Sequence, residues 1–249
     1  MRTRTGALAV ALPLAAALLA SACSSSSASS AASATASGGS SAAAPAAKIV
    51  AIGAENEYAS VISQVGGQYV QASSILSNPT TDPHTFEASP AVARELSAAK
   101  LIVQNGVGYD DWATTMENAD PSEGREVINV QQLRGLPDST PNPHLWYDPK
   151  TMPAVANAVA ADLGKIDPAH ASYYTANAAT FVSSLATWTN ALAAFKAAHQ
   201  GTPVAVTEPV SDYMLQAAGA DIMTPFTFQA DIMNGNDPSP QLIATERGL

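Results

Sequence analysis

Two of the four histidines in the sequence stand directly after a proline and two residues after an Asp or Asn. They are His84, in the run DPHTFE, and His144, in the run NPHLWYDP. Each proline fixes its own φ at about −65° and pushes the residue before it toward extended geometry, so we expect both histidines in stiff loops. Neutral imidazole nitrogen is a common ligand of zinc and other transition metals. The repeated arrangement therefore indicates two ligands of one metal site.

Glu208 is the third candidate ligand, and it stands directly after the apolar, β-branched run of residues 203–207. This composition predicts a strand, and ligands of parallel sheets bind beyond the carboxyl ends of the strands. A carboxylate oxygen suits harder ions such as manganese, whereas two histidines and one glutamate also fit zinc. The three side chains therefore leave the metal open between Zn²⁺ and Mn²⁺, and the general affinity order of divalent metals favours zinc.

Each candidate residue also has an ordinary structural explanation. A lone histidine is most often a hydrogen-bonded structural residue, and a strand-end glutamate is often a solvated surface group. His170 and His199, which fall in the first turn and near the end of a predicted long helix, are expected at the surface for that reason. The repeated proline–histidine arrangement distinguishes His84 and His144 from these two histidines.

Strands and helices alternate along the part of the chain that must hold the two histidines. Apolar residues at helical spacing predict a helix over residues 55–65 and another over 90–99, the second capped by Ser89. A further helix is expected within residues 108–126. This order of elements is typical of an α/β fold, in which a parallel sheet is flanked by crossover helices. The predicted strands cover residues 48–52, 69–76, 101–104 and 127–130.

One long helix dominates the second half of the chain. After a helix that begins near residue 151, a second helix begins at Asp167 and meets no Gly or Pro before Gly201. Its length of about 32 residues corresponds to roughly 48 Å, so we expect one rigid α-helix that joins two lobes. The second lobe offers only strands at residues 203–207 and 221–223, too few for a stable parallel sheet. We therefore expect an incomplete C-terminal lobe in a truncated chain.

The first 47 residues carry export and anchoring signals rather than a fold. Residues 1–22 combine arginines, a short apolar run and small residues at the end, which predicts a signal peptide rather than a membrane-spanning helix. Cys23, the only cysteine, follows directly and resembles the lipid-modified cysteine of a bacterial lipobox. Plain secretory cleavage that leaves a free thiol is the alternative. Residues 23–47 are therefore expected to form a lipid anchor and a disordered Ser/Ala-rich tether.

The overall charge limits the classes of partner. The formal net charge is −10, which argues against nucleic acid because its binding proteins need a basic face. The same charge is compatible with attraction of metal cations.

Four stretches of the chain together resemble one family of proteins. They are DPHTFE at 82–87, LIVQNG at 101–106, NPHLWYDP at 142–149 and KIDP at 165–168. In this order they resemble the metal-binding lipoproteins of zinc and manganese ABC importers, the cluster A-I or TroA-like solute-binding proteins. The resemblance covers most of residues 48–220, and the pair of proline–histidine motifs is its most specific part.

The resemblance implies a two-lobed fold with the metal between the lobes. An N-terminal metal-binding lobe would span residues 48–150, helices including the long linking helix residues 151–200, and a partial C-terminal lobe residues 201–249. It also implies an extracytoplasmic protein, lipid-anchored to the outer face of the cytoplasmic membrane (facing the periplasm in a Gram-negative cell). Its partner would be the ABC permease of the same importer, and we expect a monomer.

The family's ligands can be matched to this sequence one by one. His84 matches the first ligand, His144 the second and Glu208 the third, where zinc-specific members usually carry a histidine and manganese-type members often a glutamate. The fourth ligand, a carboxylate late in the second lobe, has no match here and is expected beyond Leu249. The histidine-rich loop that is frequent in zinc-specific members is absent, since residues 106–141 contain no histidine.

These observations lead to one main functional hypothesis and two alternatives. We expect a binding protein, not an enzyme, that captures zinc or manganese and delivers it to the permease. A zinc-dependent hydrolase is an alternative, because two His, one Glu and an open position also form a catalytic ligand set. The sequence lacks the H-E-x-x-H helix of metalloproteases, which argues against that alternative. An adhesin on the same fold is a third hypothesis.

Overall fold

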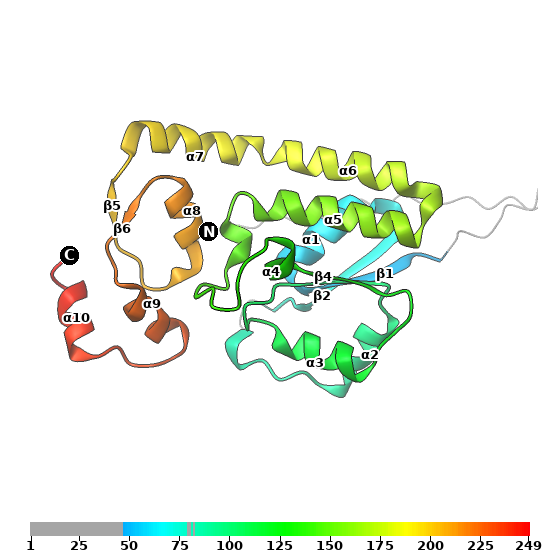
Figure 1. Cartoon of the computed structure of the whole chain (residues 1–249), viewed down its shortest axis with the longest axis horizontal. Coiled ribbons are helices and arrows are strands. Elements are labelled where there is room, and N and C mark those ends of the chain that lie inside the picture. The colour runs from blue at the N-terminus through cyan, green and yellow to red at the C-terminus, as the bar shows by residue number, and fades with distance from the viewer. Residues whose placement is uncertain (1–46, 79–80, 82) are drawn as a thin grey trace, which may run out of the picture. The chain divides into compact units, whose positions relative to one another are not determined.

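Four parallel strands form the main sheet of the computed structural model, which describes residues 47–78, 81 and 83–249, without the side chain of His84. In space the strands follow the order β2-β1-β3-β4, and every neighbouring pair is parallel (Figure 1). This confirms the predicted α/β class. The strands are β1 (Ile49–Glu55), β2 (Val70–Leu76), β3 (Leu101–Gln104) and β4 (Glu126–Asn129).

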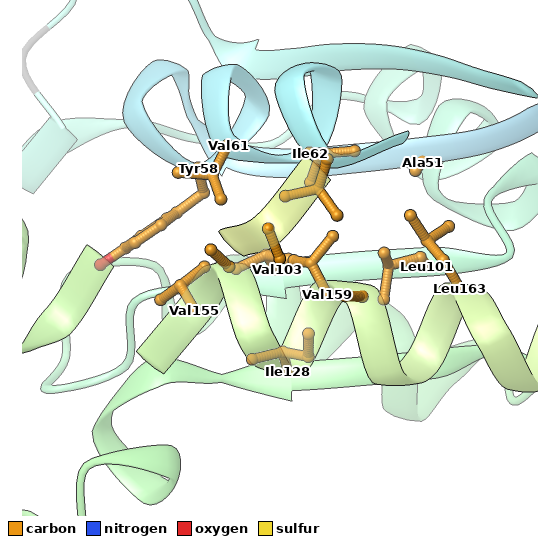
Figure 2. Packing of buried hydrophobic residues seen from close by; sticks show 14 of the residues in the cluster. Ala51, Tyr58, Val61, Ile62, Leu101, Val103, Ile128, Val155, Val159 and Leu163 are labelled. Atoms are coloured by element: carbon orange, nitrogen blue, oxygen red, sulfur yellow. The ribbon is translucent and has the colours of Figure 1, made fainter. Parts of the chain in front are cut away.

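Different helices cover the two faces of this sheet. Leu101 and Val103 of β3 belong to one buried cluster and Ile102 to the other, as the two-residue period of a strand requires. Figure 2 shows the larger cluster, in which side chains of α1 and α5 interdigitate with those of the strands. The first face is covered by α1 (Asn56–Gly66), α5 (Thr151–Ile166) and α6 (Ala171–Ser184), the second by α2 (Pro90–Ala98) and α3 (Asp111–Ala119).

β1 continues to Glu55 instead of ending at residue 52, and this places a carboxylate at the carboxyl end of the strand. The close approach of β1 to α1 depends on Gly53, because a Cβ there would lie 2.4 Å from the backbone nitrogen of Ala59. Glu55 is the N-cap residue of α1, but its side chain makes no capping hydrogen bond.

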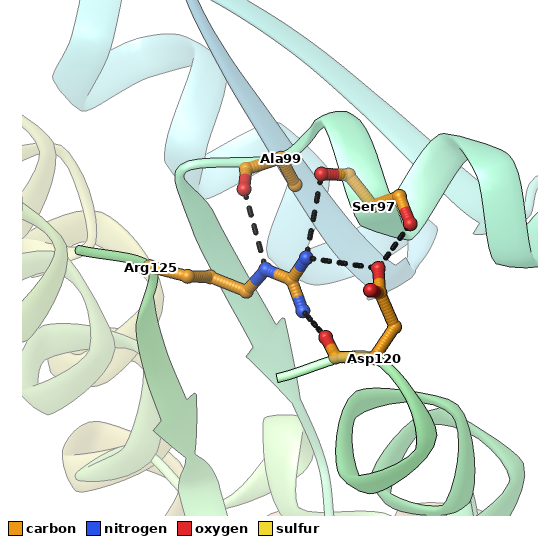
Figure 3. Close-up of polar contacts among 4 residues, drawn as sticks. All are labelled: Ser97, Ala99, Asp120 and Arg125. Carbon is orange, nitrogen blue, oxygen red and sulfur yellow. Dashed lines mark hydrogen bonds and ion pairs between the residues drawn. The ribbon is translucent and has the colours of Figure 1, made fainter. Parts of the chain in front are cut away.

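An arginine ties the second layer of helices to the sheet (Figure 3). The side chain of Arg125, just before β4, donates to the backbone carbonyls of Ala99 (3.4 Å), Ser97 (3.3 Å) and Asp120 (3.1 Å). The Ser97 hydroxyl donates to the Asp120 carboxylate, which also faces the guanidinium at 3.8 Å. Because a guanidinium offers five donors in a fixed plane, one side chain can join the end of α2, the end of α3 and the start of β4.

The long helix is interrupted at one residue. The segment predicted as continuous consists of a 3₁₀ turn (Pro168–His170), α6 and α7 (Ala186–His199), with a turn at Leu185 between the two helices. The backbone N–H of Leu185 donates to Val182 three residues earlier, and the Ser184 hydroxyl donates to the carbonyl of Phe181 at 2.6 Å. A serine that bonds back to the preceding turn bends a helix, so the break needs neither Gly nor Pro.

A second, smaller parallel sheet follows α7 and contains β5 (Pro203–Val204) and β6 (Asp221–Ile222). β5 is shorter than the predicted strand at 203–207, because the N–H of Val206 donates to the hydroxyl of Thr224 and not to the ladder. The remaining helices are α4 (Val130–Leu133), α8 (Asp212–Ala217), α9 (Phe226–Met233) and α10 (Pro240–Glu246). Short 3₁₀ turns span Gly67–Tyr69, Pro83–Thr85, Leu145–Tyr147 and Pro209–Ser211.

The N-terminal expectations lie outside the described residues. The signal peptide at 1–22, the lipidated Cys23 and nearly all of the tether at 23–47 belong to this part of the chain. Within the described residues, no helix has both the length and the apolar character needed to cross a membrane.

Glu117 of α3 is a half-buried carboxylate whose Oε1 atom is buried without a hydrogen-bond partner. Burial raises the pKa of this group from 4.5 to about 7, although the positive charge of Arg125 acts in the opposite direction. Between these two values the folded protein keeps a proton on Glu117 that the unfolded chain has lost. The contribution of this group to folding stability is therefore complete below pH 4.5 and is lost as the pH rises through about 7.

Replacing Glu117 by Gln removes this charge, so the pH dependence of stability should change. We expect Glu117→Gln to resemble the wild type near pH 4.5 and to gain stability relative to it as the pH rises to about 7. Urea unfolding of both proteins at several pH values measures the difference. Glu95→Gln, at an exposed position on α2, controls for the loss of one negative charge. A difference between variant and wild type that stays constant from pH 4.5 to 8 would contradict this account.

Candidate metal centre

The loop that carries His144 presents its ring in one orientation. His144 is 4% exposed and directly precedes the 3₁₀ turn Leu145–Tyr147. The Asn142 side-chain oxygen accepts from the backbone N–H of His144 at 3.0 Å and lies 2.8 Å from its Nδ1 atom. Because an amide oxygen only accepts hydrogen bonds, Nδ1 carries the ring hydrogen and Nε2 carries the lone pair that a metal requires.

Asn142 also joins this loop to the segment that follows Glu208. Its amide nitrogen donates to the carbonyl oxygen of Pro209 at 2.7 Å, and the Tyr213 hydroxyl donates to the backbone carbonyl of Asn142 at 2.9 Å. The Pro209 oxygen can only accept, so this contact fixes which end of the Asn142 amide faces His144. One buried side chain therefore sets both the tautomer of His144 and the distance to the Glu208 segment.

A second asparagine supports the loop from the sheet side. Asn105, at the end of β3, donates from its side chain to the carbonyl of Pro143 at 2.8 Å and accepts from the buried Tyr58 hydroxyl at 2.5 Å. The rings of Tyr109 and Trp146 pack edge-on against the imidazole of His144, with centroids 5.8 Å and 5.4 Å away. These contacts restrict the ring, so little conformational entropy remains to be lost when a ligand binds.

The turn that presents Tyr109 is strained. Val107 has a φ of 57°, a region that β-branched residues rarely adopt. The turn is held by the Asp110 carboxylate, which accepts from the backbone N–H groups of Asn105 at 2.5 Å and Gly106 at 2.8 Å. The N–H of Val107 donates to the side-chain oxygen of Gln131 at 2.7 Å. Such strain persists where surrounding hydrogen bonds enforce it, and it is concentrated at functional sites.

Glu208 lies opposite this loop. It follows β5 and precedes the 3₁₀ turn Pro209–Ser211 with extended backbone, and its exposed side chain makes no capping hydrogen bond. Glu208 and His144 line the same pocket of about 420 Å³, together with Glu57, Tyr109 and Trp146. The two candidate ligands, 64 positions apart in the sequence, thus face one cavity.

His84 can be placed only by its backbone. It is the central residue of the 3₁₀ turn Pro83–Thr85, and Pro83 lines the pocket that contains His144 and Glu208. The His84 side chain lies outside the described part of the structure. Among the residues whose side chains are described, no three His, Cys, Asp or Glu side chains converge closely enough to hold a metal ion. The ligand set of His84, His144 and Glu208 therefore stays a prediction.

The other two histidines have different roles. His199 is exposed and lies beside Phe195, with ring centroids 4.8 Å apart. His170 is half-buried, stacks on Tyr69 at 3.8 Å and has its Nδ1 atom 2.6 Å from the Asp167 carboxylate. Neither residue lines the pocket of His144.

The residues that orient and surround His144 were not predicted from the sequence. Asn142 had a detectable signal, since an Asp or Asn stands two residues before each of the two histidines. Glu57 and Tyr109 carry no such sequence signal, because only the fold brings the first turn of α1 and the loop after β3 close to the His144 loop.

Truncating Asn142 tests its role in positioning the imidazole. Asn142→Ala leaves the Nδ1 hydrogen of His144 and the Pro209 carbonyl without their partner, so we expect affinity for Zn²⁺ to fall roughly 10- to 100-fold. Titration against a competing chromophoric chelator measures it. Asn190→Ala, at an exposed position on α7, should bind as the wild type does. Unchanged Zn²⁺ affinity in Asn142→Ala would show that this side chain does not position His144 for metal binding.

The sequence and the fold both match known proteins. Residues 54–247 match the family model described as ZnuA, zinc-uptake complex component A, periplasmic. The manganese-binding lipoprotein MntA of Halalkalibacterium halodurans is 29% identical over 106 residues, which are 42% of this chain and 35% of that protein. This chain thus spans much less than two thirds of that relative.

Solved structures of similar fold contain several different metals. FpvC of Pseudomonas aeruginosa in complex with Mn²⁺ has a TM-score of 0.63 and 25% identity over 80% of this chain and 73% of its own. Zn(II)-bound AdcA of Streptococcus pneumoniae has a TM-score of 0.62 and 15% identity over 71% of this chain and 39% of its own. The resemblance seen in the sequence motifs is confirmed, and the chain belongs to the ZnuA family of metal-binding solute-binding proteins of ABC importers.

Proposed function

We propose that this protein captures a divalent transition metal outside the cytoplasm and delivers it to the permease of an ABC importer. The observation that supports this best is the orientation of His144, whose Nδ1 hydrogen is held by Asn142 so that the lone pair of the ring lies on Nε2. Glu208 lines the same pocket and supplies a carboxylate oxygen. An imidazole and a carboxylate in one cavity are the usual ligands of zinc and manganese in proteins.

In this proposal His84, His144 and Glu208 bind the ion, and the metal is zinc or manganese. Zinc is favoured by the general affinity order and by the two imidazoles, whereas the glutamate in the third place shifts the preference toward manganese. Relatives and structural neighbours carry Mn²⁺, Ni²⁺ and Zn²⁺. The cargo is bound and released without any chemical reaction.

Delivery would use the same contacts that close the pocket. The bonds from Asn142 to Pro209 and from Tyr213 to Asn142 are few and short, and they join the walls that carry His144 and Glu208. A permease that draws these walls apart would break two hydrogen bonds and separate the carboxylate from the imidazole. In such a mechanism, docking to the permease would itself cause release of the metal ion.

Ligand substitutions test the site directly. His144→Ala and Glu208→Ala each remove a ligand, so we expect affinity for Zn²⁺ and Mn²⁺ to fall by more than the roughly 100-fold effect of an outer-sphere partner. Isothermal titration of the metal-free protein measures it. His170→Ala removes a histidine that packs on Tyr69 outside the pocket and serves as the control. Equal losses in all three variants would argue against the assigned ligands.

The wild type and the Glu208→Ala variant also distinguish a metal-binding protein from a hydrolase. A carrier should show no turnover of peptide or ester substrates in the presence of Zn²⁺. Turnover that disappears in Glu208→Ala would replace the proposed function by metal-dependent hydrolysis.

We also propose that Cys23 is lipid-modified and anchors the protein to the outer face of the cytoplasmic membrane. Two acyl chains give stable anchoring, whereas a free thiol gives none. In a bacterial host, Cys23→Ala should move the protein from the membrane fraction to the soluble fraction and abolish incorporation of labelled fatty acid. Ser24→Ala should leave both unchanged. Membrane association that survives Cys23→Ala would contradict the lipid anchor.

A further inference from the structure

One carboxylate outside the predicted ligand set is buried beside two other carboxylates. Glu55, the last residue of β1, is 3% exposed, and its carboxylate oxygens make no regular hydrogen bond to a described residue, although the Asp110 carboxylate and the backbone N–H of Glu55 lie close enough to shift its pKa. The position of Glu55 as N-cap of α1 does not explain why its carboxylate is buried, since the side chain makes no capping hydrogen bond. A buried charge without a partner is costly, so the group must be either protonated or neutralised by a cation.

Glu55 lines a pocket of about 380 Å³ that is distinct from the pocket of His144 but adjoins it. Glu57, Pro83 and Tyr109 line both cavities. The described lining of the Glu55 pocket is rich in oxygen atoms and includes no Lys, Arg or His. The residues that line it are Glu55, Asn56, Glu57, Leu76, Ser77, Asn78, Thr81, Pro83 and Tyr109.

The charges around Glu55 are all negative. Burial, the nearby charge of Asp110 and that of Glu57 raise the pKa of Glu55 well above its ordinary value. Burial also raises the pKa of Asp110, to about 6, although the backbone N–H groups of Gly106 and Asn105 hold it lower. The positive end of the α1 dipole amounts to only about half a unit charge, so it offsets little of this repulsion, which a proton on Glu55 relieves when no cation is bound. A cation in the pocket would relieve the same repulsion.

The pocket also occupies the place in the fold where ligands bind. In the order β2-β1-β3-β4, the chain leaves β1 toward β2 on one side and β3 lies on the other, so β1 and β3 flank the topological switch point. Glu55 ends β1, and Asp110 belongs to the turn that follows β3. The crevice outside the carboxyl ends of these two strands is the general binding position of open α/β sheets.

We propose that this pocket is a second cation site, which holds a hard divalent ion such as Ca²⁺ or Mg²⁺ between the carboxylates of Glu55 and Glu57. Carboxylate, hydroxyl and amide oxygens with no nitrogen or sulfur ligand suit hard ions rather than zinc. The remaining positions are filled by water, as Mg²⁺ sites with one or two carboxylates usually are. Through Glu57, Tyr109 and Pro83, an ion here would fix the wall of the neighbouring pocket.

Terbium luminescence and calcium titration test this site in the full mature protein. Tb³⁺ substitutes for Ca²⁺, and Tyr109 lies in the lining to sensitise its emission. To exclude the transition-metal site, the titration is done in the double variant His144→Ala/Glu208→Ala. We expect saturable Tb³⁺ emission that Ca²⁺ displaces, and an affinity about tenfold or more weaker when Glu55→Gln is added, since affinity follows the number of charged ligands.

Controls separate this inference from the proposed function. Glu117→Gln removes another buried carboxylate with an unpartnered oxygen, but Glu117 does not line the pocket, so Tb³⁺ binding should stay unchanged. Emission that disappears in the double variant His144→Ala/Glu208→Ala would place Tb³⁺ in the transition-metal site and overturn the second site alone. Equal affinity with and without Glu55→Gln would also overturn it, and would mean that Glu55 only carries a proton, which it can donate to Asp110.

Discussion

The amide of Asn142 is the contact on which the geometry of the candidate metal centre depends. Its oxygen holds the backbone and Nδ1 atom of His144, and its nitrogen holds the carbonyl of Pro209, next to Glu208. The amide group cannot be rotated by 180°, because the atom facing His144 must accept hydrogen bonds and the atom facing Pro209 must donate one. The orientation of one ligand and the position of the other are therefore set by the same buried group.

Much of the sheet and the stiff loop that carries His144 could be predicted from local signals. The strands and α1, α2 and α5 follow from apolar periodicity, and the stiff loop of His144 follows from its flanking prolines. The break at Leu185 and the early end of β5 could not, because they depend on hydroxyls of Ser184 and Thr224 that replace regular backbone bonds. The bond from Asn142 to Pro209 spans 67 positions and needs the completed fold.

Three energetically unfavourable features lie together at the carboxyl ends of two neighbouring strands of the main sheet, β1 and β3. They are the left-handed Val107, the buried Asp110 and the buried Glu55. The packing of α1 and α5 against the sheet shows no comparable conflict, because it consists of apolar side chains and of Tyr58, whose hydroxyl is hydrogen-bonded (Figure 2). Proteins tolerate local violations of packing and charge rules where a ligand offsets their cost, which supports the site proposed at these strand ends.

The break at Leu185 changes what the linking helix can transmit. A continuous helix of this length resists bending along its whole extent, whereas a turn such as that at Leu185 is a local site of bending. α6 packs on α5 through buried side chains, whereas α7 contains no buried residue. Bending should therefore be easier at Leu185 than within α6 or α7, because its N–H bonds to the residue three positions back instead of four.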